Sequence, residues 1–92
     1  GSTPFYIACS KGELEMMNIL RSDELIDVNK PNNDGWSPFM IACYNGYKNI
    51  VEVLMIDERI DVNQSIKNGS TPFLMACSRG SKEIVNILIK DE

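Results

Sequence analysis

Three cysteines are the residues of this chain best suited to redox or metal chemistry, and they recur every 34 residues, as Cys9, Cys43 and Cys77. If each occupies the same place in successive stacked helical layers, neighbouring thiols are about 8–10 Å apart, whereas a disulfide needs α-carbons within about 7 Å. A structural zinc ion needs four ligands, and the chain has no histidine. We therefore expect buried, unpaired thiols in a reducing compartment, with no metal and no cofactor.

Acidic side chains are the other candidates for chemistry, because carboxylates can act as general acids or bases. Five of them fall at positions expected to face solvent, namely Glu15, Glu52, Glu83, Asp57 and Glu58. Histidine, the commonest general base and the usual activator of a serine or cysteine nucleophile, is missing. The glycines stand 34 residues apart rather than in a phosphate-binding cluster. The sequence predicts that the protein is not an enzyme.

Size and composition restrict the classes of function further. The 92 residues suffice for one small domain, and 43% hydrophobic with 24% charged residues is ordinary for a globular protein. The net charge of −4 argues against a general binder of nucleic acid or of anionic membranes. The longest apolar run, residues 39–44, is far shorter than a membrane span, and no secretory leader opens the chain. We expect an intracellular location, the cytoplasm, with the nucleus as an open alternative.

The elements that position these residues are repeated. Thr3-Pro4-Phe5 returns as Ser37-Pro38-Phe39 and as Thr71-Pro72-Phe73, and residues 1–20 agree with residues 69–88 at 13 of 20 positions. A fixed period in this range indicates a stack of similar supersecondary units, each covering the apolar face of its neighbour. We expect three repeats over about 1–33, 34–67 and 68–92, of which the first and last are partial.

The middle repeat predicts the local structure. Residues 32–35 carry turn chemistry, Ser37 is an expected N-cap, and Pro38 suits the first position of a helix. Gly46 should end that short helix in a left-handed conformation. A second helix is expected over about 48–56, and a brief extended stretch over 60–63, where apolar and polar residues alternate.

This arrangement resembles the ankyrin repeat family. The family signature T-P-L-H-x-A corresponds to three hexapeptides here, TPFYIA at 3–8, SPFMIA at 37–42 and TPFLMA at 71–76. The resemblance implies an all-α solenoid, an ankyrin-like stack of helix-turn-helix units with short β-turn or hairpin loops. In the family, the signature histidine ties the turns together by hydrogen bonds. It is replaced here by Tyr6, Met40 and Leu74, so we expect apolar packing to take the place of those hydrogen bonds. The period exceeds the family's by one residue, which predicts an altered end to the outer helix.

The resemblance also implies a binding surface, because in such proteins partners contact the turn tips and the concave side of the first helices. Carried over by position, this surface comprises Ser2, Ser10, Lys11, Asn33, Asp34, Trp36, Tyr44, Asn45, Lys67, Asn68, Ser70, Ser78 and Arg79. Trp36 and Tyr44 stand where the other repeats have serine, and large aromatic side chains of this kind are common interface anchors. The alternative is that Trp36 only packs on a neighbouring turn. With three cations and one anion, the surface suits an acidic or extended peptide.

The sequence is also compatible with three other interpretations. The chain could be a spacer in a longer repeat array with no partner of its own. It could also self-associate, because neither terminal repeat has the polar outer face of a capping repeat. Finally, the resemblance makes Asn29 and Asn63, in the two Asp-Val-Asn turns, candidates for hydroxylation, whereas the structural alternative is that they cap those turns by side-chain hydrogen bonds.

Overall fold

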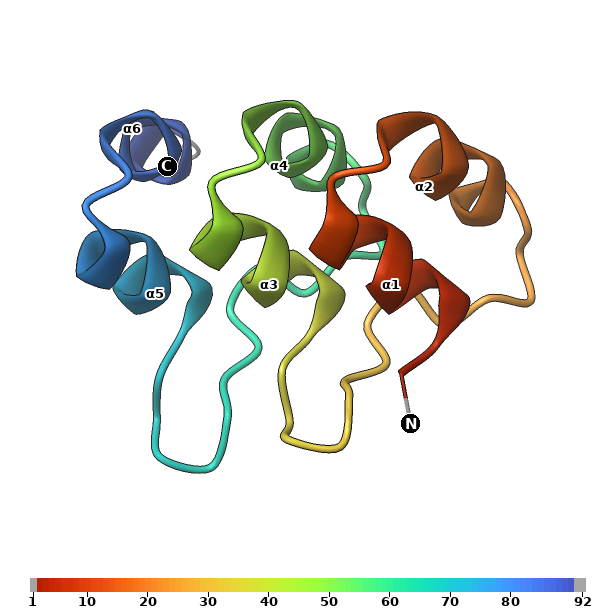
Figure 1. Cartoon of the computed structure of the whole chain (residues 1–92), viewed down its shortest axis with the longest axis horizontal. Helices are drawn as coiled ribbons and strands as arrows, with labels where there is room; N and C mark the ends of the chain where they lie inside the picture. Colours follow the sequence, from red (N-terminus) through yellow and green to blue (C-terminus); the bar gives the residue numbers. More distant parts are fainter. Residues whose placement is uncertain (1, 91–92) are drawn as a thin grey trace.

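The computed structural model describes residues 2–90, which form six helices in three consecutive pairs. The helices are α1 (Pro4–Lys11), α2 (Leu14–Arg21), α3 (Pro38–Asn45), α4 (Lys48–Met55), α5 (Pro72–Arg79) and α6 (Lys82–Lys90). The first helices of the pairs, α1, α3 and α5, lie side by side in an inner row, and α2, α4 and α6 form an outer row (Figure 1). Two long loops project beneath the inner row. The predicted all-α stack is confirmed.

Each inner helix starts and ends as the turn and cap residues predict. In the middle repeat, Oγ of Ser37 accepts a hydrogen bond from the Met40 N–H at 3.0 Å, and Pro38 takes the first helical turn. Gly46 ends the helix with a φ of 76°, and its N–H donates to the carbonyl oxygens of Ala42 and Cys43. The same caps occur at Thr3 and Gly12 and at Thr71 and Gly80.

The core lies between the two rows and between successive repeats. Phe39, Cys43, Val51 and Leu54 of the middle repeat are all buried. The small side chain of Ala42 faces the same interior, which lets neighbouring inner helices approach closely. Helices of eight or nine residues are marginal alone, so this packing between repeats must hold them.

Burial of the cysteines follows position in the stack. Cys9 and Cys43 are buried, and burial raises the pKa of each thiol to about 12. The expectation was wrong for Cys77, which is exposed because no repeat covers that side of α5 in the described part of the chain. All three thiols are unpaired, as the repeat spacing predicted.

The segment after the outer helix is a turn, so the predicted extended stretch was wrong. Asp61 Oδ1 accepts a hydrogen bond from the Asn63 N–H at 3.1 Å, and Asp27 does the same for Asn29 at 3.0 Å. An aspartate that binds the backbone two residues ahead bends the chain locally. The alternation of apolar and polar residues therefore reflects a buried Ile60 and a partly buried Val62, both packed on the core, with the turn beginning at Val62.

The predicted solvated position of Asp57 was also wrong. Its side chain is only 7% exposed, and Oδ2 accepts hydrogen bonds from Arg59 at 2.9 Å and from Arg21 at 3.2 Å. Arg59 also donates to the carbonyl oxygen of Arg21 at 2.8 Å. The carboxylate thus closes the end of α4 and ties the first repeat to the second. By contrast, Glu15, Glu52, Glu83 and Glu58 are exposed, as predicted.

Candidate functional site

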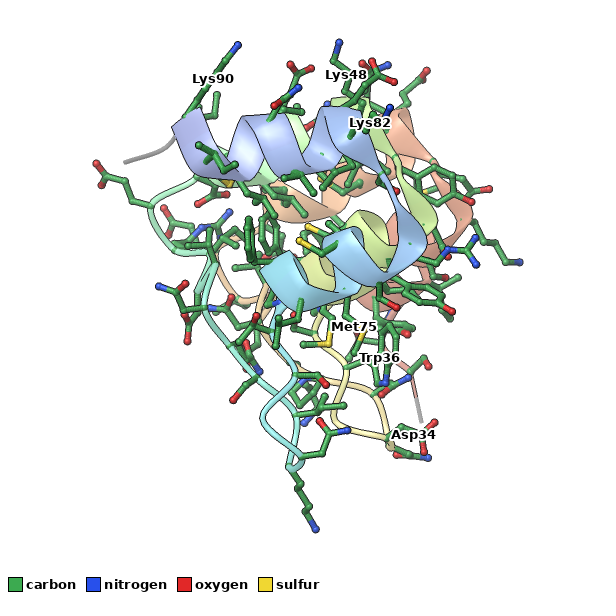
Figure 2. The ribbon with its side chains drawn as sticks, turned by 90° about the vertical axis from the view of Figure 1, so that its left-hand side faces the viewer. Asp34, Trp36, Lys48, Met75, Lys82 and Lys90 are labelled. Carbon is green, nitrogen blue, oxygen red and sulfur yellow. The ribbon has the colours of Figure 1, made fainter. Side chains whose placement is uncertain are left out.

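The side that the family resemblance predicts to be concave lies between the inner row of helices and the projecting loops (Figure 1). Figure 2 shows Trp36 just beneath the inner helices and Asp34 at the tip of the loop that leads to α3. Lys48, Lys82 and Lys90 lie on the opposite, outer side in the same view. The predicted surface residues belong to three regions, namely an aromatic cluster around Tyr44 of α3, the tips of the two loops, and the ends of the inner helices.

The aromatic cluster consists of Trp36, Tyr44 and Arg79. The indole ring of Trp36 meets the Tyr44 ring edge to face, with the centroids 5.1 Å apart and the planes at 88°. The guanidinium carbon of Arg79 lies 4.7 Å from the centroid of the Tyr44 ring. Both aromatic residues are partly buried and Arg79 is exposed. Edge-to-face rings and a cation over a ring are each favourable, so three predicted site residues form one contiguous patch.

The backbone of Trp36 is held in place by the preceding turn. Its N–H donates to Oδ1 of Asn32 at 3.0 Å, and its carbonyl oxygen accepts from the Asn32 N–H at 2.9 Å. Gly35 adopts a φ of 87°, which glycine reaches at little cost, and closes the turn onto the Asn32 carbonyl oxygen at 3.0 Å. The turn therefore fixes the backbone position from which the indole side chain extends, at the base of the loop.

The tips of the two loops flank a shallow hollow of about 390 Å³. Its lining includes four predicted residues, namely Asn33, Asp34, Lys67 and Asn68. Asp34 and Lys67 bring opposite charges to its two sides, and both are exposed. Ser70, at the base of the second loop, has its N–H bound to Oδ1 of Asn68 at 2.9 Å.

The remaining predicted residues lie along the ends of the inner helices. Asn45 donates through Nδ2 to the Ser10 carbonyl oxygen at 3.0 Å, and Ser10 donates through Oγ to Ile7 at 2.9 Å. These two side chains therefore already have partners within the protein. Lys11 and Ser78 are exposed at the ends of α1 and α5, and Ser2 is exposed ahead of α1.

Comparison with protein families gives the same architecture as the structure. A family model described as ankyrin repeats in three copies matches residues 1–66. The chain belongs to the ankyrin repeat family. A second model, of a single ankyrin repeat, matches residues 68–92. No curated protein gives a significant match. Ankyrin repeats are generally non-catalytic modules that bind other proteins.

This ankyrin repeat chain replaces the signature histidine in a way that sequence reasoning missed. The hydroxyl oxygen of Tyr6 accepts a hydrogen bond from Nδ2 of Asn32 at 3.1 Å. Burial raises the pKa of Tyr6, with a further contribution from the Asp34 charge, so the hydroxyl stays protonated. The tie between one repeat and the next turn is therefore kept here by tyrosine. Only Met40, which is fully buried, makes the apolar replacement predicted.

Asn29 joins successive repeats of the ankyrin stack. Its Nδ2 donates to the Arg59 carbonyl oxygen at 2.7 Å, and its Oδ1 accepts from the Asp61 N–H at 2.8 Å. The equivalent Asn63 is exposed. Hydrogen bonds of the Asn29 side chain thus connect its own turn to the equivalent turn of the next repeat. The carboxylate of Asp27 caps the turn that contains Asn29. Hydroxylation of either asparagine stays a prediction.

Within residues 2–90, no group of three or more His, Cys, Asp or Glu side chains is placed to hold a metal ion. None of the helices described is long and apolar enough to cross a membrane.

Proposed function

We propose that this chain binds a protein or peptide partner on its concave face, with Trp36 and Tyr44 as anchors. The observation that carries the proposal is the patch in which Tyr44 contacts both Trp36 and Arg79. Large aromatic side chains beside an arginine are typical of interface hot spots. The serines at the equivalent positions of the other repeats make the patch specific to the middle of the array.

The contact between the two aromatic rings pre-organises them for binding. The contact between Trp36 and Tyr44 restricts the rotamers of both, so less conformational entropy is lost when a partner docks. A ligand that covers the exposed part of both rings gains apolar contact without first ordering them. This favours an extended segment lying along α3 over a ligand that needs a deep pocket.

Charge favours an acidic partner. Lys11, Lys67 and Arg79 are all exposed, and Asp34 is the single acid among the surface residues proposed here. Since the chain carries a net charge of −4, a surface with three cations and one anion is opposite in sign to the rest of the molecule. Such complementarity acts mainly on the rate of association and on specificity. Glutamate or aspartate side chains flanking an apolar residue would suit the patch.

Selection from a displayed library of random peptides tests the proposal. We expect peptides enriched in acidic residues, whose dissociation constants are then measured by calorimetry. The variant Trp36→Ala/Tyr44→Ala should weaken binding at least about tenfold. A matched control, Glu52→Ala, changes an exposed residue of the outer row and should bind like the wild type. Equal binding by the double variant, with its helical circular dichroism intact, would exclude this patch as the site.

We also infer that the protein works in a reducing intracellular compartment such as the cytoplasm or nucleus. The inference is supported by the repeat spacing, which keeps the three thiols unpaired.

A further inference from the structure

The chain contains two Asn-Gly dipeptides, Asn45-Gly46 and Asn68-Gly69, in different structural settings. Asn45 is the last residue of α3, and Gly46 ends that helix. Asn68 and Gly69 lie at the tip of the loop that leads to α5, which projects beside the loop that leads to α3 (Figure 1). Both asparagines are exposed. The same dipeptide can therefore be compared at a helix end and in a loop.

An asparagine followed by glycine can react with its own backbone. The backbone nitrogen of the glycine, once deprotonated, attacks Cγ of the asparagine side chain and closes a ring. Glycine has no Cβ to obstruct this approach, and its backbone rotates more freely than that of other residues. Attack within one molecule is fast only where the chain brings the two reacting atoms into line. The structural setting of each dipeptide thus decides whether it reacts.

The carbonyl group of the Asn68 side chain is activated by a backbone N–H. Oδ1 of Asn68 accepts a hydrogen bond from the Ser70 N–H at 2.9 Å. Attack on Cγ moves negative charge onto this oxygen, and a backbone donor already aimed at it stabilises that charge, as the donors of an oxyanion hole do. The same bond folds the side chain back over the Gly69 backbone, which lies between its two ends.

The attacking nitrogen is held by a hydrogen bond that is local to the loop. The Gly69 N–H donates to the Ile66 carbonyl oxygen at 2.9 Å and closes a tight turn. This turn lies outside the helices. The bond can therefore open, and free the nitrogen for attack, without unwinding a helix.

The bonds around Asn45 oppose the same reaction. The Gly46 N–H donates to the carbonyl oxygens of Ala42 and Cys43, two buried residues of α3. The Asn45 side chain donates through Nδ2 to the Ser10 carbonyl oxygen of the preceding repeat at 3.0 Å. Attack on Cγ would require the end of α3 to unwind and the contact with Ser10 to break. The helix end therefore protects this dipeptide.

The exposure of Asn68 does not depend on where the sequence ends. Asp34 is the equivalent residue of the preceding loop, and it is exposed although the tip of the next loop lies beside it. A further repeat after the third would place another loop in the same relation to Asn68. Water, which the reaction consumes, therefore reaches the tip in either case.

We propose that Asn68 is a site of spontaneous deamidation. The Gly69 nitrogen loses its proton to hydroxide and bonds to Cγ, and the tetrahedral intermediate expels Nδ2, which takes up a proton from water and leaves as ammonia. Water then adds to a carbonyl carbon of the succinimide ring and breaks its bond to the Gly69 nitrogen. Cleavage at Cγ gives aspartate, and cleavage at the main-chain carbonyl carbon gives isoaspartate. The step transfers no electrons and consumes only water.

Both products place a carboxylate at the tip of the loop. Aspartate preserves the turn, because Asp27 and Asp61 already make the same bond to the N–H groups of Asn29 and Asn63. Isoaspartate adds a methylene group to the main chain and so alters the turn. Either carboxylate joins Asp34 at the hollow between the loops. It would weaken the attraction for an acidic partner, a consequence that rests on the function proposed above.

Ageing of the folded chain at neutral pH tests the proposal, with Asn45 as an internal control. Peptide mapping by mass spectrometry in water enriched with heavy oxygen measures deamidation at each residue, and an isoaspartyl methyltransferase detects isoaspartate. Asn68 should react at least about tenfold faster than Asn45, give isoaspartate as well as aspartate, and react faster as the pH rises. Asn68 that stays intact, or reacts no faster than Asn45, would overturn the proposal. Aspartate as the only product would also overturn it, because direct hydrolysis forms no ring.

Unfolding separates the effect of the fold from that of the local sequence. In urea, Asn45 should react about as fast as Asn68, since the helix end that protects it is gone. If Asn45 stays slow in urea, its sequence neighbours explain the protection and the structural argument fails.

Substitution of Gly69 tests the ring closure. Gly69→Ala places a Cβ beside the attacking nitrogen and should slow the reaction of Asn68 at least about tenfold. Its circular dichroism should match that of the wild type, because the loop tip lies outside the helices. An unchanged rate would exclude attack by the Gly69 nitrogen and overturn the proposal. These assays contain no partner, so their outcome is independent of the binding proposed for the concave face.

Discussion

The carboxylate of Asp57 links two repeats, because its Oδ2 accepts a hydrogen bond from Nη1 of Arg21 in the preceding repeat at 3.2 Å. The same oxygen accepts from Arg59 at 2.9 Å, and Oδ1 accepts from the Arg59 backbone N–H at 3.0 Å. Nε of Arg59 also donates to Oδ1, at 3.2 Å. The four hydrogen bonds to a largely buried carboxylate, one of them from the preceding repeat, make Asp57 hard to replace.

Replacement of Asp57 by asparagine should destabilise the fold by about 2 kcal/mol, because buried hydrogen bonds to a charged group are lost or weakened. Urea unfolding measures the change. The neighbouring substitution Glu58→Gln removes the same charge from an exposed side chain and should change stability by less than about 0.5 kcal/mol. Equal effects of the two substitutions would show that net charge, rather than the buried contact, is responsible.

The same carboxylate predicts how stability depends on pH. Its hydrogen bonds, above all those with Arg59, lower the pKa of Asp57 from 3.8 to about 2 in the folded protein. Between these values the unfolded chain binds more protons than the folded one, so the stabilisation is complete above about pH 4 and is lost as the pH falls toward 2. Unfolding curves across this range should lose this dependence in Asp57→Asn and keep it in Glu58→Gln.

Trp36 and Tyr44 should be energetically coupled, because their rings meet edge to face at 5.1 Å. A double-mutant cycle with Trp36→Ala and Tyr44→Ala should give a coupling of about 0.5–1.5 kcal/mol in urea unfolding. Both variants should keep the fold, since both side chains are only partly buried. Additive effects would mean that the rings do not pack in solution, and unfolding of both variants would assign them a structural role.

Gly12 should tolerate alanine less well than Gly80, although both have left-handed backbone, with φ of 73° and 70°. A Cβ at Gly12 would lie 2.9 Å from Cε1 of Tyr47, whereas at Gly80 the described part of the chain leaves open space. Gly80→Ala should therefore cost about 1 kcal/mol for the backbone alone. Gly12→Ala should cost more, because Tyr47 must also move. Thermal unfolding of the two variants compares them, and equal costs would contradict the contact with Tyr47.

Local structure was predictable because its signals are short in range. The cap at Ser37, the proline after it and the left-handed Gly46 each act within a few residues, and all three were predicted correctly. The 34-residue period then required the helices to stack. The burial of Asp57 depends on Arg21, which is 36 positions away and is replaced by Met55 and Ile89 in the other copies. The aspartate itself is repeated, but the equivalent Asp23 is exposed. No local pattern indicates such a pair.

The candidate site was likewise predicted only in part. Trp36 and Tyr44 were found because they break the serine pattern of the other repeats. Their mutual contact and the position of Arg79 depend on side-chain rotamers and on α5, which sequence spacing does not specify. Asn32 was missed as the residue that fixes Trp36, although its replacement by Ile66 in the third repeat was a visible irregularity.

Asn29 should contribute to stability in a way that Asn63 does not. Asn29→Ala removes the side chain that bonds the Arg59 carbonyl oxygen and the Asp61 N–H, and should cost about 1–2 kcal/mol. Asn63→Ala serves as the matched control, because this exposed residue has the same Asp-Val-Asn context and should cost less than about 0.5 kcal/mol. Chemical denaturation compares the two. If Asn63→Ala costs as much, the local turn rather than the bridge between repeats explains the effect of both.

Cys77 should be the thiol that reacts first with an alkylating agent. The thiolate is the reactive form, and Cys9 and Cys43 are both buried with the pKa raised to about 12, so at neutral pH they remain protonated and shielded. Cys77 lies exposed on α5. Mass spectrometry of dilute native protein should show one rapid modification, which Cys77→Ser abolishes.

The two buried thiols should react only as the chain unfolds, so their labelling in urea should follow the unfolding curve. Rapid modification of Cys43 in the folded protein would contradict the packing of α5 against α3, on which the covered inner row depends.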